Sequence, residues 1–227
     1  MMNFLRLVLV VAHKDVRAEL RTKEAINASF AFALIVLLLF SFAFDPESET
    51  VKEIAGGLLW IVFALAAALV LNRSFARELP NDSLDGLVSA PISGAALFLG
   101  KALANYGLVL AVELISLPVF GIFYSLNLMP FLGRLLLIVA LGAWALTVIG
   151  TMFSALTVNI RLREVMLPMM TYPILSPALM GAMRLTAALV QGQTLTGDNL
   201  VWLKLLIGFD AVYTAAALVL DDFVLVG

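Results

Sequence analysis

Cysteine is absent from this chain of 227 residues, and histidine occurs only once, at position 13. Without cysteine the chain forms no disulfide, offers no thiolate to a metal and carries out no thiol redox chemistry. One histidine cannot form a multi-histidine metal site, and we expect His13 on the protein surface. Charged residues are also scarce, at 13%, and the formal net charge is −2. Such a chain has no broad basic surface for nucleic acid.

Hydrophobic residues, by contrast, make up 63% of the chain. Soluble domains are about 45–50% apolar and about 25% charged, so this chain has too few polar residues to cover a globule in water. Several apolar runs approach the ~20 residues that a helix needs to cross a bilayer. Runs such as "FALIVLLLFSFAF" (residues 32–44) lack the polar–apolar alternation of a membrane barrel. The composition therefore predicts an all-α integral membrane protein.

We expect residues 26–227 to form a single transmembrane domain of six helices. The predicted spans cover residues 26–44, 54–71, 103–124, 135–158, 165–189 and 203–220. A cytoplasmic N-terminus places ten of the 14 lysines and arginines inside and four outside, as the positive-inside rule requires. Both termini are therefore predicted to be cytoplasmic. The stretch from 165 to 203 is longer than one span requires, which leaves a re-entrant segment within 180–200 open.

Residues 1–25 have the pattern of an amphipathic helix. Apolar residues recur at helical spacing at Leu5, Leu9, Ala12, Val16 and Leu20, whereas Lys14, Arg17, Arg21 and Glu24 share another face. Arg6 interrupts the apolar stretch and no small-residue cleavage site follows it, which argues against a signal peptide. The pattern predicts a helix along the cytoplasmic membrane surface, with a soluble leader as the alternative.

A polar segment, residues 72–102, follows the second span and carries the pattern of a short helix. Asp82 or Ser83 can cap this helix, and Pro91 follows its end. The predicted docking face consists of Leu84, Asp85, Leu87 and Val88. Apolar side chains at this spacing suit a groove on a partner protein, so we predict a coupling helix that docks a partner. The alternative is that the stripe rests on the membrane surface.

The stretch "GAALFLGKA" (residues 94–102) resembles a phosphate-binding loop but departs from it. Five residues rather than four separate its glycines, Ala102 stands where Ser or Thr would bind magnesium, and no strand precedes it. We therefore expect no ATP hydrolysis by this chain alone. Lys101 is expected at the membrane interface, where the third span begins.

The fifth predicted span contains three prolines within ten positions. A proline inside a helix removes one backbone hydrogen bond and costs about 3 kcal/mol or more. Lipid cannot bond the carbonyl groups left free, whereas another helix or a water-lined cavity can. The pattern predicts a broken, pathway-lining helix inside the bundle, carrying Pro168, Tyr172, Pro173 and Pro177. A kinked structural helix that its neighbours repair is the alternative.

One carboxylate, Glu113, lies midway along the third predicted span. A charged group there costs roughly 2.5–3.5 kcal/mol on insertion scales, so Glu113 is expected to face protein or water. It is either an internal functional site or a protonated group bonded to a neighbouring helix. Asp210 lies closer to the predicted outer interface, so a charge there is expected to cost less free energy. The 15 glycines contain no GxxxG spacing that would predict a helix-dimer seam.

Three longer stretches are specific enough to indicate a family. They are "RSFARELPNDSLDGLVSAPISGAALFLGKALAN", "ALTVNIRLREVMLPMMTYPILSPALM" and "WLKLLIGFDAVYTAAALVLDDFVLVG". In this order they resemble the haem exporter protein B (CcmB) family of cytochrome c maturation, a branch of the ABC-2 type permeases. The chain departs from that family at Tyr106, where tryptophan is frequent, and at Val112, where many members have proline. The Asp221–Asp222 pair also replaces an aromatic–acid pattern.

The resemblance implies the permease subunit of an ABC-type complex in the bacterial inner membrane. Such a subunit pairs with a separate ATPase subunit (CcmA) and works beside CcmC, CcmD and the haem chaperone CcmE. It couples ATP hydrolysis by the partner to haem export or to release of the haem-loaded chaperone. It is not an enzyme by itself, it binds no cofactor stably, and haem is its candidate substrate.

Two other functions fit the same sequence. A general ABC-2 exporter subunit for a lipid, a glycan or a drug has the same architecture. An assembly scaffold without transport activity would hold haem-handling partners together. An intramembrane enzyme is less well supported, because no nucleophile–base pair or metal cluster is evident in the sequence.

Overall fold

The computed structural model describes residues 4–44, 48–75, 93–157, 160 and 162–226, without the side chains of residues 49, 163 and 220–226. Within these residues the chain forms seven α-helices, one short 3-10 helix and no strand. The helices are α1 (Phe4–Thr22), α2 (Glu24–Ala43), α3 (Glu49–Leu71), α5 (Gly94–Phe123), η3 (Met129–Phe131), α6 (Leu132–Thr157), α7 (Arg163–Val190) and α8 (Asp198–Val226). The predicted all-α fold is confirmed.

In the described part of the chain, every α-helix except α1 is long and apolar enough to cross a membrane, which makes six candidate spans. Their ends differ from the prediction by a few residues at several points, and most at the start of α5. Helix α5 begins at Gly94 rather than near 103, because the Ser93 hydroxyl caps it by accepting a hydrogen bond from the Ala96 amide at 3.3 Å. Helix α7 runs on to Val190 and α8 begins at Asp198, so this stretch contains no re-entrant segment.

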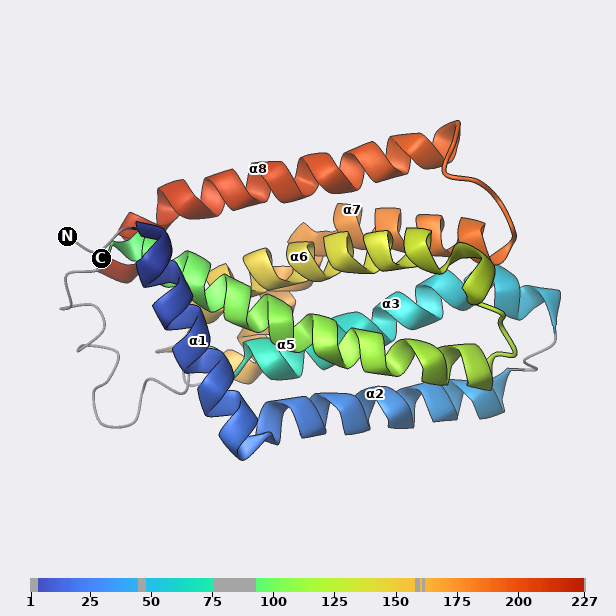
Figure 1. Cartoon of the computed structure of the whole chain (residues 1–227), viewed down its shortest axis with the longest axis horizontal. Coiled ribbons are helices and arrows are strands. Elements are labelled where there is room, and N and C mark those ends of the chain that lie inside the picture. Colours follow the sequence, from blue (N-terminus) through green and yellow to red (C-terminus); the bar gives the residue numbers. More distant parts are fainter. Residues whose placement is uncertain (1–3, 45–47, 76–92, 158–159, 161, 227) are drawn as a thin grey trace.

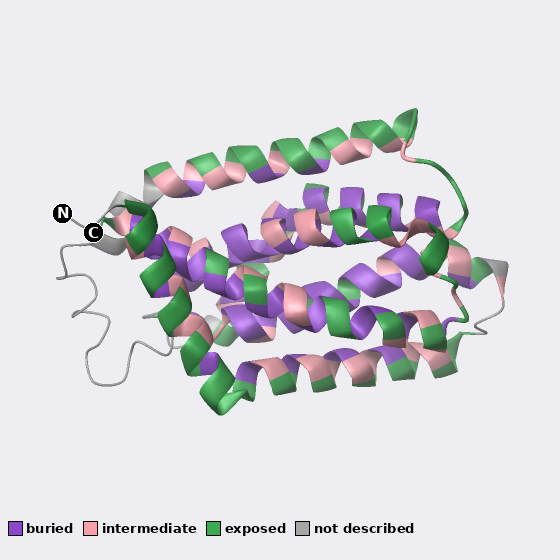
Figure 2. Cartoon of the chain, viewed as in Figure 1, coloured by how far each residue is buried: buried purple, intermediate pink, exposed green. Residues whose placement is uncertain are grey.

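Helices α3 and α6 form the centre of the bundle, and α2 and α8 lie at opposite edges (Figures 1 and 2). Within the spans, 72% of α3 and 67% of α6 are buried, against 22% of α2 and of α8. Although α2 and α8 are largely exposed, their exposed side chains include large apolar ones, such as Phe42 and Val212. Such surfaces are suited to lipid rather than to water.

Helix α1 lies across one end of the bundle, over the first turns of α5 (Figure 1). The last turn of α3 and the C-terminal part of α8 lie at this same end, which we call the α1 end. The turn between α5 and α6 and the loop between α7 and α8 lie at the opposite end, which we call the far end. The two ends of the bundle are therefore formed by different helices and connections.

A glycine brings α3 and α7 close together. A side chain at Gly56 would collide with the backbone of α7 at Met183 and Ala187. Close backbone approach through a small residue is a common way to pack helices in membranes. A search for GxxxG spacing misses this contact, because Gly56 packs against a different helix and needs no second glycine four residues away.

Candidate functional site

The predicted docking residues Leu84, Asp85, Leu87 and Val88 lie outside the described residues, so their role stays a prediction. The structure does describe the two flanks of this segment, which are residues 71–75 after α3 and residues 93–105 at the start of α5. Both flanks lie at the α1 end. They meet in a group of buried polar side chains that we call the polar junction: Asp15, Ser74, Lys101, Asn105, Thr151 and Ser154.

Lys101 is the centre of the polar junction and is wholly buried. Its Nζ donates to Asp15 Oδ2 of α1 at 3.1 Å and to the Ser74 carbonyl at 3.2 Å. The ammonium group also lies 4.8 Å from the centre of the Phe75 ring, in cation–π geometry. Lys101 is therefore enclosed by protein and is not the exposed interfacial anchor that the sequence suggests. Helix α1 covers this part of α5 and supplies the carboxylate that makes burial of the charge tolerable.

The other members of the polar junction extend it to α6. Asn105 donates through its side-chain nitrogen to Ser74 Oγ and to Thr151 Oγ1, both at 2.8 Å. The hydroxyl of Ser154 donates to the Leu71 carbonyl at 2.9 Å. Residues 71–75, which lead into the segment 76–92, are thus bonded directly to α5 and α6, and Lys101 links them to α1. No sequence pattern indicates these contacts, because the partners are far apart in the chain.

The prolines of α7 do not break it, since α7 is one continuous helix from Arg163 to Val190. The predicted broken helix is wrong. Pro173 and Pro177 are exposed and Pro168 is half-buried, whereas the face toward the bundle carries Leu167, Leu175, Ala182 and Leu185. The helix turns its bulky apolar face inward because that face gains most from packing. Pro173 and Pro177 are therefore left on an exposed side of α7.

A serine compensates for one of these prolines. Pro177 has no amide hydrogen, so the Pro173 carbonyl, four residues earlier, loses its helical partner. The Ser176 hydroxyl donates to that carbonyl at 2.9 Å. The repair is therefore local to α7 at this position. It agrees with the alternative of a kinked structural helix, except that the repairing group belongs to the same helix.

Two side-chain hydrogen bonds fasten α7 to α3. The Tyr172 hydroxyl donates to the Ala64 carbonyl at 3.1 Å. The indole nitrogen of Trp60 donates to Thr186 Oγ1 at 2.9 Å. Tyr172, predicted on a pathway, thus lies in a contact between two helices, and its functional role stays a prediction.

Two carboxyl groups are buried inside the bundle. Glu113 of α5 is 1% exposed and Asp210 of α8 is 7% exposed. Neither carboxyl oxygen of either residue has a hydrogen-bond partner among the described residues. The burial of Glu113 agrees with the expectation that it faces protein rather than lipid. Asp210 is also buried, although a charge there is expected from the sequence to be the less costly of the two.

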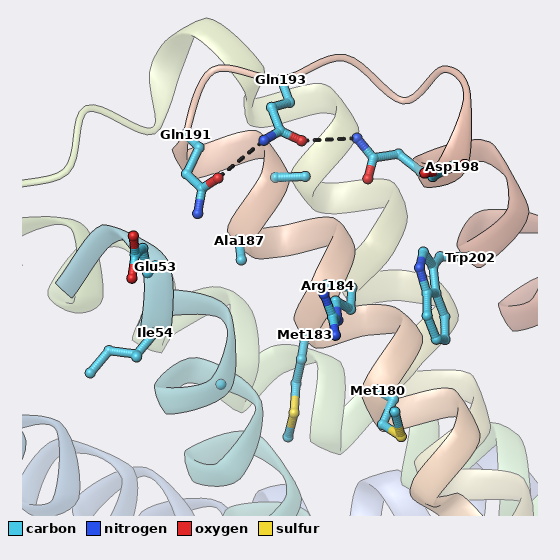
Figure 3. Close-up of a pocket in the computed structure, with 13 residues that line it drawn as sticks. Glu53, Ile54, Met180, Met183, Arg184, Ala187, Gln191, Gln193, Asp198 and Trp202 are labelled. Atoms are coloured by element: carbon cyan, nitrogen blue, oxygen red, sulfur yellow. Dashed lines mark hydrogen bonds between the residues drawn. The ribbon is translucent and has the colours of Figure 1, made fainter. Parts of the chain in front are cut away.

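A pocket of about 610 Å³ opens at the far end between α3, α7 and the start of α8 (Figure 3). Met180, Met183 and Trp202 supply its apolar surface. Its polar residues include Glu53, Arg184, Gln191, Gln193, Asp198 and Asn199. Such a pocket suits an amphipathic molecule. Because the two carboxylates outnumber Arg184, net charge does not favour an anion there.

The candidate site residues do not converge on one centre. The polar junction lies at the α1 end, the pocket lies at the far end, and Glu113 and Asp210 lie in the helices between them. Within the described residues no three acidic or histidine side chains are grouped as metal ligands. The arrangement is that of a polytopic helical membrane protein whose internal polar groups connect helices.

Comparison with known proteins assigns the family. The chain belongs to the CcmB protein family, whose model matches residues 6–224. Its relatives include heme exporter protein B of Rhodobacter capsulatus, 34% identical over 73% of this chain and 76% of the relative. The protein of the same name from Paracoccus denitrificans is 36% identical over the same shares. That of Pseudomonas aeruginosa is 30% identical over 92% of this chain and 90% of the relative.

Proposed function

We propose that this chain is the permease subunit of an ABC-type complex that handles haem during cytochrome c maturation. A separate CcmA-like ATPase subunit supplies the energy, and CcmC-, CcmD- and CcmE-like proteins are its other partners. The family match, which covers nearly the whole chain, and relatives named heme exporter protein B support this proposal. The six candidate spans fit an integral subunit of a transporter.

The α1 end faces the cytoplasm of the bacterial inner membrane in this proposal. Charge supports the orientation, because this end carries the basic residues of α1 together with Arg73 and Lys101. The far end, with the pocket around Arg184, then faces the outside. Haem, or the chaperone that carries it, meets the permease on that side.

The polar junction is the single observation on which the coupling mechanism depends. An ATPase docked on residues 84–88 would pull on a segment whose flanks are bonded to α1, α5 and α6 through Lys101 and Asn105. Through these bonds, movement of the partner would be transmitted directly to three helices. In particular, α5 carries Glu113, and α6 lies at the centre of the bundle. Nucleotide-driven movement at the α1 end can therefore rearrange the spans.

ATP binds to the partner and not to this chain. Residues 94–102, which resemble a phosphate-binding loop in sequence, lie within helix α5. A helical backbone uses its amide groups in its own hydrogen bonds and cannot wrap a phosphate as a loop does. This geometry supports a permease that depends on a separate motor.

The test is co-expression of the tagged chain with its ATPase subunit, comparing Leu87→Asp with Met129→Asp. Met129 is 78% exposed in η3 at the far end, so its substitution is a control for adding a charge away from the docking face. We expect Leu87→Asp to abolish ATPase co-purification and covalent haem attachment to c-type cytochromes, with normal insertion. Retention of both would contradict the proposal.

A catalytically dead ATPase partner separates the proposed function from a scaffold. An energy-coupled permease requires ATP hydrolysis, so cytochrome c maturation should stop although the complex still assembles. Normal maturation with the dead partner would favour a scaffold. Normal maturation after deletion of this chain, with a different exported compound retained in the cell, would favour a general ABC-2 exporter.

A further inference from the structure

Helix α1 has three chemically different faces, and only one of them packs on the bundle. The packed face carries Val8, Val11 and Glu19, with Asp15 beside them. Glu19 is wholly buried, and the Asp15 side chain is 18% exposed. Both acidic residues of α1 therefore point toward the bundle, which leaves no acidic residue on the two outer faces.

The rotation of α1 about its own axis is fixed by contacts at both its middle and its end. Asp15 bonds to buried Lys101, and Val11 packs against Gly100 so closely that any side chain at Gly100 would collide with it. At the C-terminal end, Glu19 Oε1 accepts a hydrogen bond from the Ile26 amide of α2 at 3.0 Å. The outer faces of α1 thus have a defined direction.

The first outer face is apolar. Leu5, Leu9 and Leu20 are 66%, 63% and 54% exposed. The sequence pattern places these residues on one face of the helix, and the structure turns that face away from the bundle. Three exposed leucines along one face of the helix indicate contact with an apolar phase.

The second outer face is basic and borders the first. A groove of about 780 Å³ runs along it and is lined by Arg6, His13, Lys14, Arg17 and Arg21 together with Leu9. Among the described residues that line this groove, none is acidic. Lys14 forms an ion pair with Asp15 at 3.1 Å. The arginines of this face, Arg6, Arg17 and Arg21, are permanent cations that attract anionic groups, and Leu9 joins the groove to the apolar face.

We infer that α1 binds anionic phospholipid headgroups in the basic groove, with the leucine face inserted among the acyl chains. Helix α2 is a candidate span that begins at Glu24, two residues after α1 ends at Thr22, so α1 is held at the membrane edge. A phospholipid offers an anionic group and an apolar chain side by side, as these two faces require. An acidic protein surface would match the basic face and leave the leucines uncovered.

Native mass spectrometry of the purified full chain tests this inference, with phosphatidylglycerol and phosphatidylcholine of equal chain length as the probes. The test variant is Arg6→Gln/Arg17→Gln/Arg21→Gln, and the matched control is Arg134→Gln/Arg184→Gln/Lys204→Gln. The control removes the same charge from exposed residues outside α1. Each basic residue near an anionic surface contributes about fivefold to binding at low salt, so we expect the preference for phosphatidylglycerol to fall at least tenfold. The control should keep the preference.

Several outcomes would overturn the inference. These are equal binding of both lipids by the parent chain, an undiminished preference in the test variant, or an equal loss in the control. Loss of ATPase co-purification with lipid binding intact would assign the basic face to a protein instead. If the test variant does not fold, the parent decides, because its preference must vanish as ionic strength nears 1 M, where charges are screened beyond about 3 Å. None of these measurements involves haem or ATP, so they can fail while the proposed function stands.

Discussion

Lys101 and Asp15 stand 86 positions apart in the chain, yet their side chains form an ion pair of 3.1 Å that joins α5 to α1. The same ammonium group bonds to the Ser74 carbonyl, next to the segment predicted to dock the ATPase. Burying a charge inside a membrane protein costs free energy, so such a residue is expected to be functional. Here it connects the surface helix, the third candidate span and the flank of the coupling segment.

The first prediction concerns this ion pair. Lys101→Met should lower the free energy of unfolding by about 1–3 kcal/mol, because the buried Ser74 carbonyl loses its donor, whereas Asp15 keeps its ion pair with Lys14. In a double-mutant cycle with Asp15→Asn, we expect a coupling energy of about 0.5–3 kcal/mol, since the two residues are in contact. Denaturant unfolding in detergent measures both quantities. Strict additivity of the two substitutions would show that the pair does not interact.

The first prediction also covers function, which should respond to changes in the polar junction more strongly than stability does. Asn105→Leu removes the bonds to Ser74 and Thr151 but keeps a side chain of similar size. We expect the ATPase subunit still to co-purify, while cytochrome c maturation falls because movement is no longer passed to α5 and α6. If Asn105→Leu co-purifies with the ATPase subunit and still supports normal cytochrome c maturation, the coupling mechanism is contradicted.

The number and class of the helices could be predicted from hydropathy alone, because each span must satisfy its own backbone in lipid. The start of α5 was predicted too far along the chain, although Ser93 is a local capping signal that the sequence contains. The burial of Lys101 could not be predicted, because it depends on Asp15 of α1, which is 86 positions away.

The second prediction concerns the serine that bonds the Pro173 carbonyl. Ser176→Ala should destabilise the chain by roughly 0.6 kcal/mol, the average for side-chain hydrogen bonds in membrane helices. The effect should vanish in a Pro177→Ala background, because the alanine amide then bonds to the Pro173 carbonyl. Thermal unfolding of the four variants tests this. An equal effect in both backgrounds would mean that Ser176 does not compensate for the proline.

The third prediction concerns all three prolines together. Replacing Pro168, Pro173 and Pro177 by alanine should raise stability, because each proline inside a helix costs about 3 kcal/mol. Membrane insertion should be preserved, and cytochrome c maturation should fall if these residues permit α7 to bend during transport. Unchanged maturation in the stabilised variant would make the prolines structural only.

Local sequence reasoning failed at α7 for a physical reason. The energetic cost of proline is local, and it correctly signals an unbonded carbonyl. Which side of the helix carries that carbonyl depends on packing with α3, for example through Tyr172 and the Ala64 carbonyl. A usable signal was present nonetheless, since Ser176 lies three residues after Pro173 and can reach back to its carbonyl.

The fourth prediction concerns Glu113, one of the two buried carboxyl groups. Glu113→Leu should leave the chain at least as stable as the parent, because it removes a buried polar group that has no hydrogen-bond partner among the described residues. If Glu113 serves transport, maturation falls in Glu113→Leu. Glu113→Gln keeps shape and polarity without a titratable proton, so it separates a need for ionisation from a need for polarity. Stability that drops sharply in Glu113→Leu would indicate a bonded structural role instead.

The last prediction concerns the pocket at the far end. Gly57 lines it, and a Cβ added there meets no atom within 4 Å, so Gly57→Phe should narrow the pocket without disturbing the fold. Gly133 of α6 is equally open and does not line the pocket, which makes Gly133→Phe the matched control. If the pocket receives haem or its carrier, cytochrome c maturation falls in Gly57→Phe alone, with unfolding temperatures equal to the parent in both variants. Equal maturation in the two variants would argue against a route through the part of the pocket beside Gly57.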